Sequence, residues 1–174
     1  MKNAKDDAMK KQILYQRMKD TCACLYLHTM DAEFAIAAHE VGESGKPLTT
    51  GALRALSRGL MEKYYGPEVV LEAESDMESL IIKGLYTPFN YNQYLIFKYY
   101  PYTIGMVAAI TLAKKVTEGG PADRDAYLNF LKSGGSYYPL ENLRAAGVDM
   151  ETDEPFQTAC DTFKSLVDQL DALL

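Results

Sequence analysis

Three observations predict an all-α fold, a multi-helix array with one long N-terminal helix and a kinked aromatic-rich helix. No stretch of the 174 residues shows a convincing alternation of apolar and polar side chains, which is the pattern of a half-buried strand. Apolar residues instead recur at intervals of three and four, the period of one helix face. Glycine or proline stands near the ends of these periodic stretches. We expect a single helical domain, 1–174, because a chain of this length is long enough to build one hydrophobic core.

The first predicted helix is long. No proline or glycine interrupts the chain between positions 6 and 42, and the segment is rich in residues that favour helices. One apolar stripe consists of Leu14, Met18, Cys22 and Leu25, and a second consists of Leu27, Met30, Phe34 and Ala37. Because the second stripe opens in the later half, we expect that half to be buried on two sides.

A second helix is predicted after the turn that contains Pro47. Thr49 or Thr50 can cap its N-terminus, because a threonine hydroxyl accepts a hydrogen bond from a backbone N–H of the first turn. Gly66 and Pro67 end it. Its apolar side chains follow helical spacing: Leu53, Leu56, Leu60 and Tyr64.

The middle of the chain is predicted to form a helix at 76–85 and then an aromatic-rich element at about 89–117. Pro101 should kink the aromatic-rich element, because proline lacks a backbone N–H and clashes with the carbonyl four residues earlier, that of Phe97.

Three helices are predicted in the tail, at 121–132, 139–146 and 155–174, and each begins at a proline. Gly134 and Gly135 fit a C-cap of the first of these helices better than a phosphate cradle, since no strand precedes the turn. Gly147 closes the short helix.

Charge and composition exclude several classes of protein. The chain has 18 Lys and Arg and 24 Asp and Glu, which gives a net charge of −6. Because the basic residues are also scattered along the sequence, nucleic-acid binding is disfavoured. No apolar stretch is long enough to span a bilayer, and no membrane partner is expected. The N-terminal residues have no apolar core typical of a secretory signal, so we expect a cytoplasmic protein.

Metal ligands are scarce. The two histidines, His28 and His39, are eleven residues apart on one predicted helix, roughly 16 Å at 1.5 Å per residue, so they cannot share an ion. The run from His39 to Glu43 resembles the zinc motif HExxH but has glutamate where the second histidine belongs. We therefore predict a solvated helix end there, and no catalytic or metal-binding residue in this chain.

The three cysteines, Cys22, Cys24 and Cys160, have no disulfide or metal-ligand spacing. Cys22 and Cys24 point about 200° apart on a helix. We expect all three to be small buried hydrophobic residues in a reducing compartment.

The segment 86–102 holds six of the thirteen tyrosines: Tyr86, Tyr91, Tyr94, Tyr99, Tyr100 and Tyr102. Composition alone favours a packed aromatic helix with its hydroxyls at the wet rim. Phenol hydroxyls can also bind a peptide backbone or stabilise an oxyanion, so both interpretations stay open at this point.

Several sequence stretches resemble the C-terminal part of oligoendopeptidase F, a family of zinc metallopeptidases related to thimet oligopeptidase. The chain has TMDAEF at 29–34 where the family has a TMFAEFE-like stretch, GKPLT at 45–49 where it has GEPLT, and KYYG at 63–66. The tail FLKSGGSYYPLENLRAAGVDM, residues 130–150, resembles the family's closing segment almost residue for residue.

The tyrosine segment resembles the family's aromatic signature H-F-Y-x-x-F-Y-x-Y-x-Y-x-x-G. The signature is matched by Tyr94, Phe97, Tyr100, Tyr102 and Gly105. Asn92 stands where the family has a substrate-contacting histidine, and Lys98 where it has a tyrosine. The resemblance implies that the substrate-binding residues are Asn92, Tyr94, Lys98, Tyr100 and Tyr102.

The resemblance also implies what this chain does not contain. In the family, zinc polarises the scissile carbonyl and the glutamate of HExxH activates water, but HExxH and the third ligand would precede position 6. We expect a C-terminal fragment of an oligopeptide-cleaving zinc metalloendopeptidase that forms part of the peptide-binding channel and is inactive alone. The alternative is a stand-alone, non-catalytic helical protein that binds peptides or a partner chain.

The resemblance carries expectations about cofactor and partners. No cofactor is expected in this chain, and zinc is expected in the full-length family member. Oligopeptides are the expected ligands. The expected protein partner is a second copy in a homo-oligomer or the missing N-terminal portion, because a fragment without its packing partner exposes apolar surface.

Overall fold

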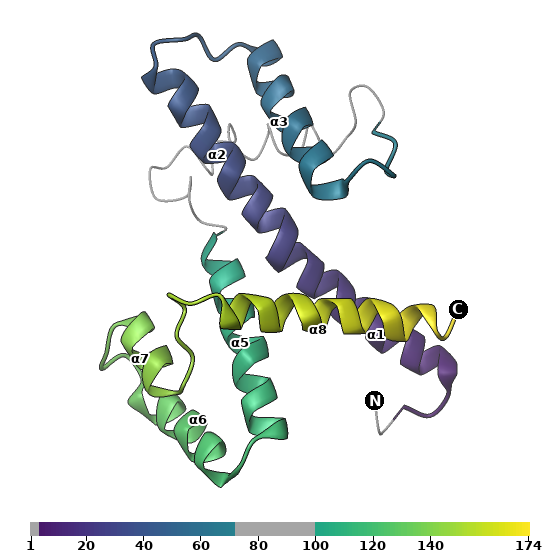
Figure 1. Ribbon diagram of the computed structural model, residues 1–174, viewed down its shortest axis with the longest axis vertical. Coiled ribbons are helices and arrows are strands. Elements are labelled where there is room, and N and C mark those ends of the chain that lie inside the picture. The colour runs from purple at the N-terminus through teal and green to yellow at the C-terminus, as the bar shows by residue number, and fades with distance from the viewer. Residues whose placement is uncertain (1–3, 72–99) are drawn as a thin grey trace. The chain divides into compact units, whose positions relative to one another are not determined.

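The computed structural model describes residues 4–71 and 100–174, and within these ranges it is helical without a strand, which confirms the all-α fold class. The elements are α1 (Asp7–Cys22), the π-helical η1 (Ala23–Leu27), α2 (His28–Glu43), α3 (Thr50–Tyr65), α5 (Tyr100–Glu118), α6 (Pro121–Ser133), α7 (Pro139–Ala145) and α8 (Glu154–Asp171). Figure 1 labels each α-helix. The predicted helix at 76–85 lies outside the described residues. No helix within the described ranges combines the length and apolar character needed to cross a membrane.

The chain divides into two compact units. Unit 1 comprises Met1–Leu25 and Ile104–Leu174, and unit 2 comprises Tyr26–Thr103. In unit 1, α1 packs against α8 and α6 packs against α7 (Figure 1). In unit 2, α2 packs against α3. The prediction of a single domain concerns the whole chain and stays a prediction.

Helix ends in the described residues follow the capping residues. The Thr49 hydroxyl accepts a hydrogen bond from the Ala52 N–H at 3.2 Å and caps α3, as predicted. At the end of α7, Gly147 has a φ of 81°, and the Val148 N–H donates to the Leu143 carbonyl at 2.9 Å. This left-handed turn satisfies a carbonyl that the helix leaves free, so the prediction that Gly147 closes the helix is confirmed.

The segment predicted as one long helix consists of α1, η1 and α2 in succession. The spacing of apolar residues did not predict the π-helical turn, in which one extra residue per hydrogen-bonded ring shifts the side chains around the axis. The turn contains Leu25, the last residue of the first apolar stripe, and Leu27, the first residue of the second. The predicted kink at Pro101 concerns the Phe97 carbonyl and lies outside the described residues.

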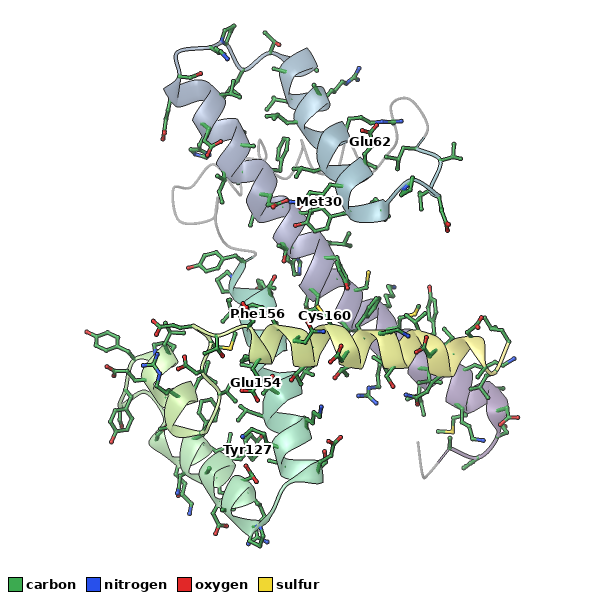
Figure 2. All side chains as sticks on the ribbon, viewed as in Figure 1. Met30, Glu62, Tyr127, Glu154, Phe156 and Cys160 are labelled. Atoms are coloured by element: carbon green, nitrogen blue, oxygen red, sulfur yellow. The ribbon has the colours of Figure 1, made fainter. Side chains whose placement is uncertain are left out.

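The core of unit 2 lies between α2 and α3. Its buried side chains come from both helices: Met30, Phe34, Ala38, Leu53 and Met61, with Leu27, Leu56, Leu60, Tyr64 and Leu71 partly buried against them. Figure 2 labels Met30 on α2. The prediction that this half of the long helix is buried on two sides is wrong for the described residues. Its buried positions are 30, 34 and 38, which form one line, and 35, which points about 100° away from Phe34, whereas Ile36 on the remaining side is 50% exposed.

The core of unit 1 joins α5 to the tail. Its buried side chains are Ala108, Leu112, Leu143, Ala146 and Val148, with Tyr127, Phe130 and Met150 packed against them. Tyr127 on α6 is labelled in Figure 2. Thr111 is buried between α5 and the start of α8, where its hydroxyl donates to the Val107 carbonyl at 2.9 Å. This hydrogen bond satisfies the polar group that the core encloses.

None of the three cysteines forms a disulfide within the described residues, and the prediction that all three are buried is wrong. Cys22 and Cys24 are half-buried and Cys160 is exposed. Cys160 lies on α8 (Figure 2), whose buried positions include Pro155 and Ala159. A residue next to Ala159 on the helix points about 100° away from that buried line, so Cys160 faces outward. Burial raises the pKa of the Cys22 thiol.

An ion pair and a hydrogen bond on the surface of unit 2 connect α2 to α3. The Lys63 ammonium lies 2.6 Å from the Glu33 carboxylate and 5.4 Å from the centre of the Tyr64 ring. Burial, the Glu33 charge and a hydrogen bond to Glu33 together raise the pKa of Tyr64 to about 12. The phenol thus stays protonated well above the usual range for tyrosine.

The raised pKa of Tyr64 predicts a loss of stability at alkaline pH. The folded state holds the phenol proton of Tyr64 more tightly than the unfolded state does. The proton therefore contributes to the free energy of unfolding in full below about pH 10, and this contribution disappears as pH rises through about 12. The expected effect is on the order of 1 kcal/mol, because solvent screens a half-buried group. Urea unfolding at about pH 8 and about pH 11 should show a larger loss of stability in the wild type than in Tyr64→Phe. Equal losses would mean that Tyr64 titrates like an exposed tyrosine.

Candidate functional site

Two of the five predicted substrate-binding residues lie in the described part of the chain. Tyr100 and Tyr102 lie in the first turn of α5, which begins at Tyr100, and these residues are 52% and 49% exposed. Asn92, Tyr94 and Lys98 lie outside the described residues, so their roles stay predictions. The exposed tyrosines agree with an aromatic element that leaves its hydroxyls in water, and they leave room for a ligand.

The start of α2 contacts the first turn of α5 within unit 2. The His28 and Tyr102 rings have their centroids 5.4 Å apart and are tilted by 43°. The residues that follow them directly, Thr29 and Thr103, are hydrogen-bonded through their hydroxyls at 3.3 Å. An aromatic contact of this separation and a side-chain hydrogen bond together hold Tyr102 against α2.

The carboxylate of Asp31 lies near His28. Its Oδ2 lies 4.0 Å from Nδ1 of His28, and its side chain is 33% exposed. Burial raises the pKa of Asp31, and the nearby His28 opposes that rise. His28 therefore lies beside a half-buried acid on its own helix and an exposed tyrosine on α5.

The described residues do not fit a zinc ion. Among residues 4–71 and 100–174, no group of three His, Cys, Asp or Glu side chains is placed to hold a metal. Nδ1 of His39 lies 2.7 Å from the Ala35 carbonyl, one turn earlier on α2. His39 thus makes a contact within its own helix.

Comparison with known proteins settles the family. The model of peptidase family M3 matches residues 2–162 of the chain. The chain belongs to peptidase family M3. The resemblance to oligoendopeptidase F found in the sequence is thereby confirmed, since relatives of that name match the chain over its whole length.

Relatives of this M3 chain are much longer than it is. Over 174 residues it is 33% identical to oligopeptidase PepF of Bacillus subtilis (strain 168), a match that covers 100% of this chain and 25% of that protein. It is also 33% identical over 174 residues to oligoendopeptidase F (plasmid) of Lactococcus lactis subsp. cremoris, of which the match covers 28%. The M3 chain therefore spans about a quarter of the length of these relatives.

A solved relative has the same fold as the M3 chain. The crystal structure of oligoendopeptidase-F from Enterococcus faecium matches with a TM-score of 0.81 at 32% sequence identity. The match covers 99% of this chain and 32% of that structure.

Sequence reasoning missed His28 and Asp31 as members of this site. The spacing of three residues between His28 and Asp31 predicts that they share one helix face. The proximity of His28 to Tyr102 could not be read from spacing, because the neighbouring hydrogen-bonded pair, Thr29 and Thr103, is 74 residues apart in the sequence.

Proposed function

We propose that this M3 chain forms part of the peptide-binding channel of an oligopeptide-cleaving zinc metallopeptidase and does not cleave peptides by itself. The observation that carries the proposal is the pair of exposed tyrosines, Tyr100 and Tyr102, in a segment that resembles the family's aromatic signature. Its relatives are named oligopeptidase and oligoendopeptidase, which supports oligopeptides as the ligands.

The chemistry of the two tyrosines suits an extended peptide. A phenol hydroxyl donates a hydrogen bond to a peptide carbonyl and accepts one from an N–H, and the ring packs against an apolar side chain. Tyr102 is held by His28, so less side-chain freedom is lost when a peptide binds.

The residues of this chain argue against cleavage by the chain alone. Hydrolysis by a family M3 zinc centre needs three ligands and a base, and the sequence holds only two histidines, eleven positions apart. The described residues contain no metal-binding group. The metal and the water-activating glutamate would come from another part of a longer protein.

Cleavage of a quenched fluorogenic oligopeptide tests this proposal. We expect the purified chain to give no chelator-sensitive cleavage with or without added zinc, while oligopeptidase PepF of Bacillus subtilis serves as the positive control. Calorimetric titration of the chain with a mixture of oligopeptides should give heat at Kd values of about 1 µM to 1 mM. Zinc-dependent cleavage by the chain, or no heat at millimolar peptide, would overturn the proposal.

The alternative is a stand-alone, non-catalytic helical protein that binds peptides or a partner chain. Asn92 and Lys98 favour it, because they stand where the family pattern has a histidine and a tyrosine. Mixing this chain with PepF lacking the matching quarter separates the two proposals. Restored cleavage supports a channel part that joins an N-terminal portion, and peptide binding without restored cleavage supports the stand-alone protein. Homo-oligomer formation stays a prediction in either case.

A further inference from the structure

Asp31 is a half-buried acid without a Lys or Arg partner in the described chain. Its side chain is 33% exposed, and His28 at 4.0 Å is the ionisable neighbour within ion-pair distance in residues 4–71 and 100–174. That separation exceeds a hydrogen bond, so the imidazole does not satisfy the carboxylate directly. A carboxylate removed from water in this way is costly unless a cation joins it.

Glu33, two residues further along α2, shows the contrast. Its carboxylate is held by the Lys63 ammonium at 2.6 Å and 2.9 Å. Two acids on one helix thus have different described surroundings, since Glu33 pairs with a lysine and Asp31 lies near His28 alone among the ionisable groups of residues 4–71 and 100–174. Among residues 4–71 and 100–174, no Lys or Arg lies within ion-pair distance of Asp31, so its carboxylate can attract a cation from a ligand.

The surroundings of Asp31 suit an organic cation. His28, which lies beside Asp31, also contacts the exposed ring of Tyr102 at 5.4 Å. A phenol ring attracts an ammonium or guanidinium group through its face, and a nearby carboxylate adds a charge-assisted hydrogen bond. A metal ion is less suited, because the described residues place no group of three ligands together.

We propose that Asp31 recognises a cationic group of the bound peptide, an ammonium or a guanidinium, next to the ring of Tyr102. The inference rests on the proposed function and adds a substrate class to it: the chain prefers peptides with a basic residue. Asp31 then determines specificity, Tyr102 contributes the aromatic surface, and His28 positions Tyr102.

The test is a pair of N-acetylated, C-amidated alanine-based peptides that differ in one central residue, lysine or glutamine. Titration calorimetry of the full chain at about pH 8 should give an affinity about 5- to 10-fold higher for the lysine peptide. Asp31→Asn should abolish this preference by lowering the affinity for the lysine peptide to that for the glutamine peptide. Higher salt should reduce the preference in the wild type, because salt screens a half-exposed ion pair.

Glu43→Gln is the matched control. It removes the same charge from an exposed position at the end of α2, about 18 Å from Asp31 along the helix, so the lysine preference should persist. Equal wild-type affinities for the two peptides would overturn the inference while the proposed function stands. An equal fall in both affinities in Asp31→Asn would show a structural role and overturn it as well. Binding of neither peptide would overturn the proposed function itself.

Discussion

Replacement of Phe34 by alanine is expected to lower the free energy of unfolding of unit 2 by about 3–5 kcal/mol. Phe34 is 1% exposed and is the largest fully buried side chain of the described chain. It lies among Met30, Leu53 and Met61, where α2 meets α3. Truncation removes the apolar contacts of the ring and leaves a cavity that the two helices can close only in part. Urea unfolding followed by far-ultraviolet circular dichroism measures the loss.

Ile36→Ala provides the control for this prediction. Ile36 lies two positions further along α2 and is 50% exposed, so its truncation should change the unfolding free energy by no more than about 0.5 kcal/mol. Similar effects of the two substitutions would contradict the burial of Phe34 and with it the packing of α2 on α3.

Replacement of Gly119 by alanine is expected to destabilise unit 1 by roughly 2–3 kcal/mol. A Cβ atom at this position would overlap the Lys115 carbonyl oxygen and the Asp123 carboxyl group. The Lys115 carbonyl cannot move away freely, because it accepts the Gly119 N–H at 2.9 Å at the end of α5. The Asp123 carboxylate is also held, since it accepts the Gly120 N–H at 3.1 Å at the start of α6. The melting temperature and the urea midpoint should both fall.

Gly105→Ala is the control and should have the opposite sign. Gly105 lies within α5, and a Cβ atom there would meet nothing within 4 Å. Alanine should therefore stabilise the helix by about 0.5–1 kcal/mol, because glycine loses more backbone freedom on folding. A stabilising effect at both positions would show that the turn between α5 and α6 is looser than the structure has it.

The only residues of the candidate site that could be predicted from the sequence are those that match the family's aromatic signature. The resemblance named Tyr100 and Tyr102, and both are exposed. Asp31 is different, because the feature that singles it out is a partly buried carboxylate without a Lys or Arg partner. Burial and ion pairing depend on residues far away in the chain, and no spacing within α2 reports them.

The sequence by itself determined the all-α class, the family and most helix ends in the described residues. Capping is local, since Thr49 bonds the Ala52 N–H three residues on and Gly147 adopts its turn within its own loop. Helical spacing also selected the correct side of α3. It named Leu53, Leu56, Leu60 and Tyr64, all of which contact the core of unit 2.

Only the tertiary structure decided how deeply each position of a helix is buried. On α3 the most buried line runs through Leu53, Ser57 and Met61, although serine gives no apolar signal. Cys160 has an apolar side chain and is exposed. The physical reason is that a periodic pattern fixes which residues share a face, whereas the neighbouring helix fixes which part of that face loses water. That neighbour is α3 for α2 and α1 for α8, and each is set by contacts between residues distant in sequence.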